Sequence, residues 1–150
     1  MSDTESTKQT ASPYFRRDQQ TGISPPDLTK DSNYVDHIVH ARGKRTRFTS
    51  VSLDLSRLRD LGEASYRLIR EEIDADGHYL VEHAELVGAL RTIVGQERRG
   101  EKQKAIQALR YARLRKEGLV DWRAFDISRI HRNDVITWAA DRIQKYFKRV

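Results

Sequence analysis

Apolar residues recur along this chain with two different spacings, and the spacing separates the expected strands from the expected helices. Short runs in which apolar residues mix with Thr, Ser or charged residues predict strands at residues 13–17, 46–53, 66–70, 119–122 and 124–127. Apolar residues three or four positions apart predict helices at residues 34–40, 54–63, 81–94, 101–116 and, after a cap at Asn133 or Asp134, up to residue 147. The mixture predicts an α+β fold.

Breaks in this pattern indicate the ends of the elements and of the domain. Residues 1–12 are polar and lack aromatic side chains, which predicts a disordered N-terminal tail followed by a single α+β domain at 13–150. The run Asp74-Ala75-Asp76-Gly77 is typical of a turn. Gly118 is expected to end the helix 101–116 as its C′ residue.

Composition narrows the classes of function. The chain has no cysteine, which excludes disulfides, thiolate zinc sites and cysteine nucleophiles. Its formal net charge of +6 favours an acidic partner, nucleic acid or protein, or else serves solubility. No apolar run is long enough to cross a bilayer and the N-terminus lacks a secretory signal pattern, so we expect no membrane partner. The expected location is the cytoplasm, or outside the cell after export by a signal-peptide-independent route.

Three of the expected strand segments carry residues that together make a coherent chemical site. Arg16 lies in the first segment and can clamp a pyrophosphate or ribose through charge-assisted hydrogen bonds. Ser50 lies in the run Arg47-Phe48-Thr49-Ser50-Val51-Ser52, where hydroxyls can bind a ribose or hold a carboxylate. Glu117 can bind the 2′-hydroxyl of a ribose and stabilise positive charge as a glycosidic bond breaks. This order suits cleavage of the nicotinamide–ribose bond of NAD.

These segments resemble the motifs of the mono-ADP-ribosyltransferases found among bacterial toxins and effector domains. Phe15-Arg16-Arg17-Asp18 is similar to the family's tyrosine, arginine, glycine, aspartate strand, with Arg17 in the glycine place. Phe48-Thr49-Ser50-Val51-Ser52 is similar to its aromatic and serine–threonine–serine strand, with Val51 in the threonine place. Glu117 followed by Leu119 and Val120 resembles the strand with the catalytic glutamate, and Ile130 to Ile136 resembles the family's closing segment. The likeness covers roughly residues 13 to 138.

The resemblance implies a fold, a substrate and a role for each residue. The fold would be α+β with a small split antiparallel-rich sheet and packed helices. NAD would be the substrate, bound by Arg16 and by Ser50, with Thr49 and Ser52 supporting the strand and Glu117 as the catalytic residue; no metal is expected. Arg115 stands where members that modify arginine have an acidic or amide residue, which argues against an arginine acceptor. The target would be an acidic protein or a nucleic acid, and a neutralising immunity protein would be a further partner.

Each residue also has a plainer interpretation. Arg16 and Arg17 can be charges at a strand edge, and Ser50 and Ser52 can be the polar face of an amphipathic strand. Glu117 can be the last residue of a basic helix that a glycine then ends. On these interpretations the chain is a non-enzymatic, winged-helix-like module that binds nucleic acid through its basic helices, or a degenerate fold kept for protein contacts.

Two other segments have metal-like spacing. Residues 72–83 resemble a calcium-binding loop, but His83 takes the place of the bidentate glutamate, so a tight turn is the simpler interpretation. His37 and His40 are three residues apart and have no obvious third ligand.

Overall fold

The computed structural model describes residues 12–39, 45–96 and 99–150. Except for Ser12, the tail expected at residues 1–12 lies outside this part of the chain, and so does His40. The strands are β1 (Phe15–Asp18), β2 (Phe48–Ser52), β3 (Ala64–Leu68), β4 (Tyr79–Val81), β5 (Glu117–Asp121) and β6 (Phe147–Arg149). The α-helices are α2 (Tyr34–Val39), α3 (Arg70–Ala75), α4 (His83–Gln96), α5 (Arg99–Arg115) and α6 (Val135–Ile143). Short 3₁₀ helices cover Leu55–Leu61, Arg132–Asp134 and Gln144–Tyr146.

The six strands form one antiparallel sheet in the order β4-β5-β2-β1-β3-β6, which confirms the α+β class. Its two halves are joined narrowly. β2 pairs with β5 along all of Phe48–Ser52, and β1 pairs with β3 along all of Phe15–Asp18. The only Cα pair in the register of β1 and β2, by contrast, is Phe15 with Ser52, so the two central strands separate beyond that point.

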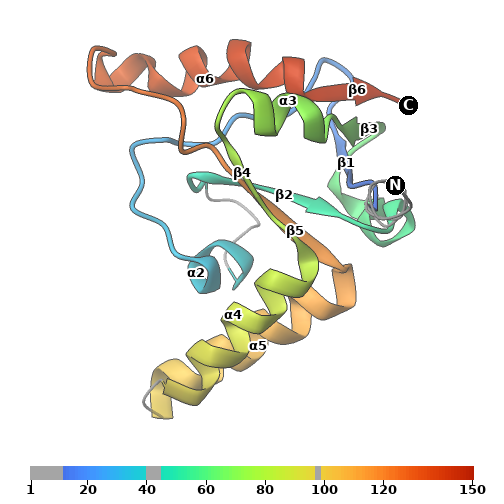
Figure 1. The fold of residues 1–150 in the computed structure, drawn as a ribbon, viewed down its shortest axis with the longest axis vertical. Helices are drawn as coiled ribbons and strands as arrows, with labels where there is room; N and C mark the ends of the chain where they lie inside the picture. The colour runs from blue at the N-terminus through green and yellow to red at the C-terminus, as the bar shows by residue number, and fades with distance from the viewer. Residues whose placement is uncertain (1–11, 40–44, 97–98) are drawn as a thin grey trace, which may run out of the picture.

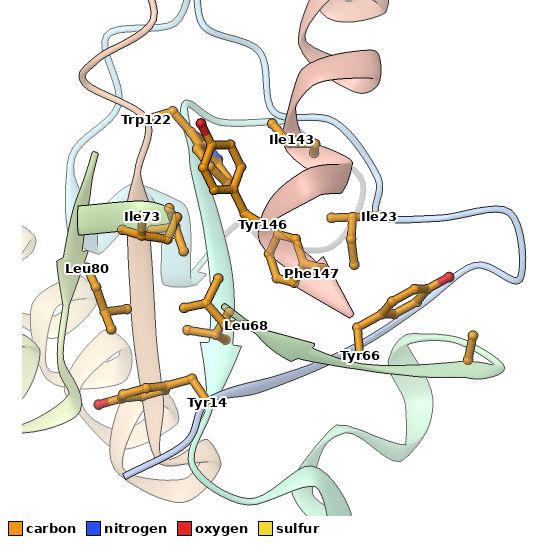
Figure 2. Close-up of a cluster of buried hydrophobic side chains, with 13 residues drawn as sticks. Tyr14, Ile23, Tyr66, Leu68, Ile73, Leu80, Trp122, Ile143, Tyr146 and Phe147 are labelled. Atoms are coloured by element: carbon orange, nitrogen blue, oxygen red, sulfur yellow. The ribbon is translucent and has the colours of Figure 1, made fainter. Parts of the chain in front are cut away.

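Helices cover the two faces of the sheet (Figure 1), because the side chains of each strand alternate between the faces. In β5, Leu119 packs against α2, α4 and α5 in one core cluster, while the neighbouring Val120 packs in the other. That second cluster holds Ile73 of α3 and Ile143 of α6 together with a group of aromatic rings (Figure 2). None of the helices in the described part of the chain has the length and apolar character that crossing a bilayer requires.

The expected elements over residues 34–40, 46–53, 81–94 and 101–116 match α2, β2, α4 and α5 within a few residues. Three short elements escaped prediction. β4 and β6 have three residues each, which is too few for a period to show, and α3 has Ile73 as its one large apolar residue. The last helix, expected up to residue 147, ends earlier, because α6 stops at Ile143, a 3₁₀ helix covers Gln144–Tyr146, and Phe147 begins β6, which pairs with β3.

The strand expected at residues 124–127 is wrong, because the backbone there bonds locally. Arg123 N donates to Asp121 O (2.8 Å), Phe125 N donates to Trp122 O (3.4 Å), and Ala124 N donates to His78 Nδ1 (3.3 Å). These amides are therefore occupied by a turn and a side chain. The segment leads the chain from the sheet toward α6.

Contrary to expectation, Gly118 does not end helix α5. Lys116 makes the turn with a φ of 49°, and Gly118 is the second residue of β5. A Cβ at Gly118 would lie 2.8 Å from Tyr14 Cε1 and 2.9 Å from Val81 O. Glycine is needed at this position because the ring of Tyr14 and the backbone of β4 approach it closely. Its φ does not require a glycine.

Candidate functional site

The three central strands bring Arg16, Ser50 and Glu117 into one hydrogen-bonded group. Arg16 lies on β1, Ser50 in the middle of β2 and Glu117 at the start of β5. Arg16 Nη1 donates to Ser50 O at 2.8 Å, and Ser50 Oγ donates to Glu117 Oε2 at 2.7 Å. Residues separated by 34 and 67 positions thus meet where the central strands diverge.

The divergence of β1 and β2 explains how Arg16 reaches this group. A backbone carbonyl inside a sheet normally bonds to the next strand. Here β1 and β2 are in register only at Phe15 and Ser52, and the guanidinium of Arg16 binds the carbonyl of Ser50 instead. β1 lies inside the sheet, between β2 and β3, so the interpretation of Arg16 as an edge-strand charge is wrong.

Asp18 holds the other side of the guanidinium. Arg16 Nε donates to Asp18 Oδ2 at 2.7 Å, and Ser24 donates to the same carboxylate through its backbone N (2.9 Å) and its Oγ (2.7 Å). Burial alone would raise the pKa of Asp18, but Arg16 and Ser24 together hold this pKa below its ordinary value. Asp18 is therefore ionised at neutral pH and orients Arg16.

Glu117 is a strand residue, and the interpretation as a helix end is wrong. Its Cα pairs with Ser52 in the β2–β5 register, and its backbone carbonyl lies 2.9 Å from His83 Nδ1. The turn at Lys116 separates it from α5. The register places Glu117 next to β2, within reach of the Ser50 hydroxyl.

The Glu117 carboxyl group is buried and only half satisfied. The residue is 2% exposed, and among the described residues Oε1 has no hydrogen-bond partner while Oε2 accepts from Ser50. Burial raises the pKa of Glu117, and the Ser50 hydrogen bond with the charges of Arg115 and Arg16 opposes that rise. A buried carboxyl oxygen without a partner is costly, which marks Glu117 as a candidate functional residue.

His37 joins the group from α2, and the sequence analysis missed this role. Its Nε2 lies 2.6 Å from Ser50 Oγ, and its Nδ1 is hydrogen-bonded to Thr46 Oγ1. Burial, with the nearby charge of Arg16, lowers the pKa of His37 to about 3, so the ring is neutral. The only signal in the sequence was the spacing of His37 and His40, which suggested a metal and not a hydroxyl partner.

Thr49 and Ser52, expected above to support the strand, make structural contacts. Thr49 lies toward the aromatic cluster, and its Oγ1 accepts from Trp122 Nε1 at 2.9 Å. Ser52 Oγ donates to Arg115 O at 2.5 Å and accepts from Asp54 N at 3.0 Å. Both residues brace β2, and Ser52 also ties it to the chain just before Glu117.

The chemical capacity of this site follows from its charges. A carboxylate with one fixed and one unpartnered oxygen can accept a hydrogen bond from a hydroxyl and stabilise a nearby positive charge. A half-buried guanidinium can bind a phosphate. The described residues hold no group of three or more His, Asp or Glu side chains with metal-binding geometry.

Comparison of the chain with protein-family models, with curated proteins and with solved structures gives no match.

Proposed function

We propose that this protein is a mono-ADP-ribosyltransferase-like enzyme that cleaves the nicotinamide–ribose bond of NAD and transfers ADP-ribose to a target. The observation that carries the proposal is the Glu117 carboxyl group, buried with Oε2 held by Ser50 and Oε1 without a partner among the described residues. A ribose 2′-hydroxyl is a hydrogen-bond donor that fits the unpartnered oxygen. Arg16 and Ser50 are half-buried, so the site reaches the surface beside them.

The reaction uses these groups in separate ways. The bond between ribose C1′ and the nicotinamide nitrogen breaks, and nicotinamide leaves with the electron pair, so positive charge develops on the ribose. Glu117 stabilises this charge through the 2′-hydroxyl, and Arg16 binds the diphosphate. A nucleophile on the target, or water, then forms a bond to C1′ and loses its proton.

The arrangement of the sheet supports an ADP-ribosyltransferase-like fold. Three adjacent antiparallel strands, β1, β2 and β5, supply arginine, serine and glutamate in that order along the chain. The sheet is narrowly joined between β1 and β2, in keeping with a split sheet. Arg16 and Ser50 lie on the side of the Phe15–Ser52 pair where β1 and β2 diverge, and the Arg16 guanidinium bridges the two strands there.

We propose a toxin or effector role with an acidic target, protein or nucleic acid. The net charge of +6 favours such a partner. Lys102, Arg110 and Arg113 are exposed on α5, the helix that leads into the Glu117 strand. Exposed basic residues toward the C-terminal end of α5, such as Arg113, would attract an acidic target toward the bound NAD.

The geometry gives little support to the non-enzymatic alternative, a winged-helix-like nucleic-acid-binding module. The strand that follows α5 would have to form part of an exposed wing. Instead β5 lies inside the sheet between β4 and β2.

The test is release of free nicotinamide when the purified chain is incubated with NAD. We expect release above the uncatalysed rate, and faster release or labelling when an acidic target is present. Ser50→Ala should slow it, because Glu117 loses the hydrogen bond to Oε2. An inactive wild-type chain that binds DNA with steep salt dependence, unchanged by Ser50→Ala, would support the alternative and reject the proposal.

A further inference from the structure

His37 is a buried histidine whose two ring nitrogens are both engaged by hydroxyl groups. The residue is 6% exposed, and Phe48 packs edge-on against its ring with centroids 5.7 Å apart. Nδ1 is bonded to Thr46 Oγ1, and Nε2 lies 2.6 Å from Ser50 Oγ. These contacts fix the ring in one orientation and join it to the residue that holds Glu117.

Counting hydrogens along this chain of contacts fixes the direction of each bond when Glu117 is ionised. A neutral imidazole has one N–H, and each hydroxyl has one O–H. An ionised carboxylate can only accept, so Ser50 Oγ donates its hydrogen to Glu117 Oε2 and accepts from His37 Nε2–H. His37 Nδ1 is then an acceptor, and Thr46 Oγ1–H donates to it rather than to Phe48 O, which lies 3.5 Å away. Thr46 Oγ1 can accept in turn from Phe48 N at 3.3 Å, so every group is satisfied.

The direction of these bonds affects the ionisation state of Glu117. With Nε2–H donating to Ser50, the serine hydroxyl can give its hydrogen only to the carboxyl group. A hydrogen bond donated to a carboxylate is stronger than one donated to a neutral carboxyl, and donors in series strengthen one another. Without the His37 donor, the Ser50 hydroxyl would be free to rotate away from Glu117.

We propose that His37 is a positioning residue, whose Nε2–H holds the Ser50 hydroxyl on Glu117 and thereby favours the ionised carboxylate that the reaction needs. This inference rests on the proposed function for its catalytic meaning. The hydrogen-bond direction itself follows from the contacts and from the ionised state of Glu117, whatever reaction the site performs. His37 contributes from α2, an element outside the three strands that carry the reacting residues.

Other charged groups around Glu117 do not replace this role. Arg16 of β1 and Arg115 at the end of α5 both act on the Glu117 carboxyl by charge. His83 of α4 bonds the backbone carbonyl of Glu117 and not its side chain. Arg16 is also the charge that acts on His37, where it favours the neutral ring. Of these groups, only His37 determines which way the Ser50 hydroxyl points.

Two substitutions separate the nitrogens of His37. In His37→Gln the side-chain amide nitrogen lies as many bonds from Cα as Nε2 does, so it can still donate to Ser50. In His37→Asn the amide lies as far as Nδ1, so it can reach Thr46 but not Ser50. The readout is the acid limb of the pH profile of nicotinamide release. We expect His37→Gln to keep the wild-type limb and His37→Asn to shift it upward by about half a unit to one unit, the worth of one hydrogen bond.

A role in packing alone would affect both variants alike. Equal shifts in the two variants, or an unshifted limb in His37→Asn, would overturn the inference. Thermal unfolding of each variant across the same pH range checks that the folded protein is being measured.

A measurement on the wild-type chain tests the inference without relying on the folding of a variant or on activity toward NAD. The ¹⁵N chemical shifts of the His37 ring distinguish the two neutral tautomers, and His37→Gln assigns the signals. If the chain cleaves NAD, we expect the Nε2–H tautomer at a pH above the acid limb of the profile. If it does not, we expect this tautomer at a pH above the titration of the Glu117 carboxyl group, followed through its ¹³C signal. An Nδ1–H tautomer there would overturn the inference. A chain that is inactive toward NAD but shows the Nε2–H tautomer would reject only the proposed function.

Discussion

The Glu117→Gln variant is expected to release nicotinamide from NAD on the order of 100- to 1,000-fold more slowly than the wild-type chain, the range seen when one electrostatic stabiliser of a transition state is removed. Glutamine keeps the size of the side chain and can still accept from Ser50 through its amide oxygen. It has no negative charge to stabilise the positive charge that develops on the ribose. The measurement is the initial rate of nicotinamide release at saturating NAD.

Glu71→Gln is the matched control, since Glu71 is exposed on α3, outside the site. Stability supplies a second control. Burial raises the pKa of Glu117, so its ionised form destabilises the fold above the ordinary pKa of a glutamate, and this destabilisation disappears as the pH falls. Glu117→Gln should therefore be at least as stable as the wild type at alkaline pH, with the difference shrinking toward acid pH. A variant as active as the Glu71→Gln control would contradict the assigned role.

The Trp122→Ala variant is expected to lower the free energy of unfolding by about 3–5 kcal/mol, as for other buried aromatic residues. Trp122 is 2% exposed, and its ring lies near those of Tyr146 and Phe147 in the core between the sheet and α6 (Figure 2). It also stacks near the ring of Phe125. Its Nε1 also donates to Thr49, so the substitution removes a hydrogen bond as well as packing. Urea unfolding followed by circular dichroism measures the change.

The second tryptophan of the chain is the matched control. Trp138 is half-buried on α6, where its ring contacts Phe125 edge-on and lies under Arg142. Trp138→Ala should cost clearly less than Trp122→Ala. Thr49→Val should cost about 1–3 kcal/mol, because it leaves the buried Trp122 N–H without an acceptor. Equal losses for the two tryptophan variants would show that the cluster around Trp122 is not the core that supports β2.

The parts of the site that could be predicted are those that lie on strands with a recognisable local pattern. Arg16 lies beside Tyr14 and Phe15, and Ser50 lies between Phe48 and Val51 in a run that mixes apolar residues with Thr and Ser, so each strand could be found from its own residues. Glu117 was predicted as a site residue from the order of the three motifs along the chain, although its local sequence fitted the end of a helix equally well. Which interpretation holds depends on strand pairing, and only the structure shows that Glu117 pairs with Ser52.

What could not be predicted depends on contacts between distant segments. Gly118 looked like a helix cap because glycine usually ends helices through its φ, whereas here it makes room for Tyr14 and the backbone of Val81. β4 and β6 are too short to show alternation and exist because a neighbouring strand offers hydrogen bonds. His37 lies 13 residues before Ser50 on a separate element, and no local pattern connects a histidine of a short helix to a serine of a strand.

The central claim is that Glu117 Oε1 receives the ribose of NAD while Arg16 binds its diphosphate. The most direct measurement is a crystal structure with an NAD analogue whose nicotinamide–ribose link is an unreactive carbon–carbon bond. We expect the 2′-hydroxyl of that ribose at hydrogen-bond distance from Glu117 Oε1, with the Ser50–Glu117 contact kept and the diphosphate against Arg16. An analogue bound elsewhere on the molecule, with Glu117 Oε1 still buried and out of contact with it, would contradict the account.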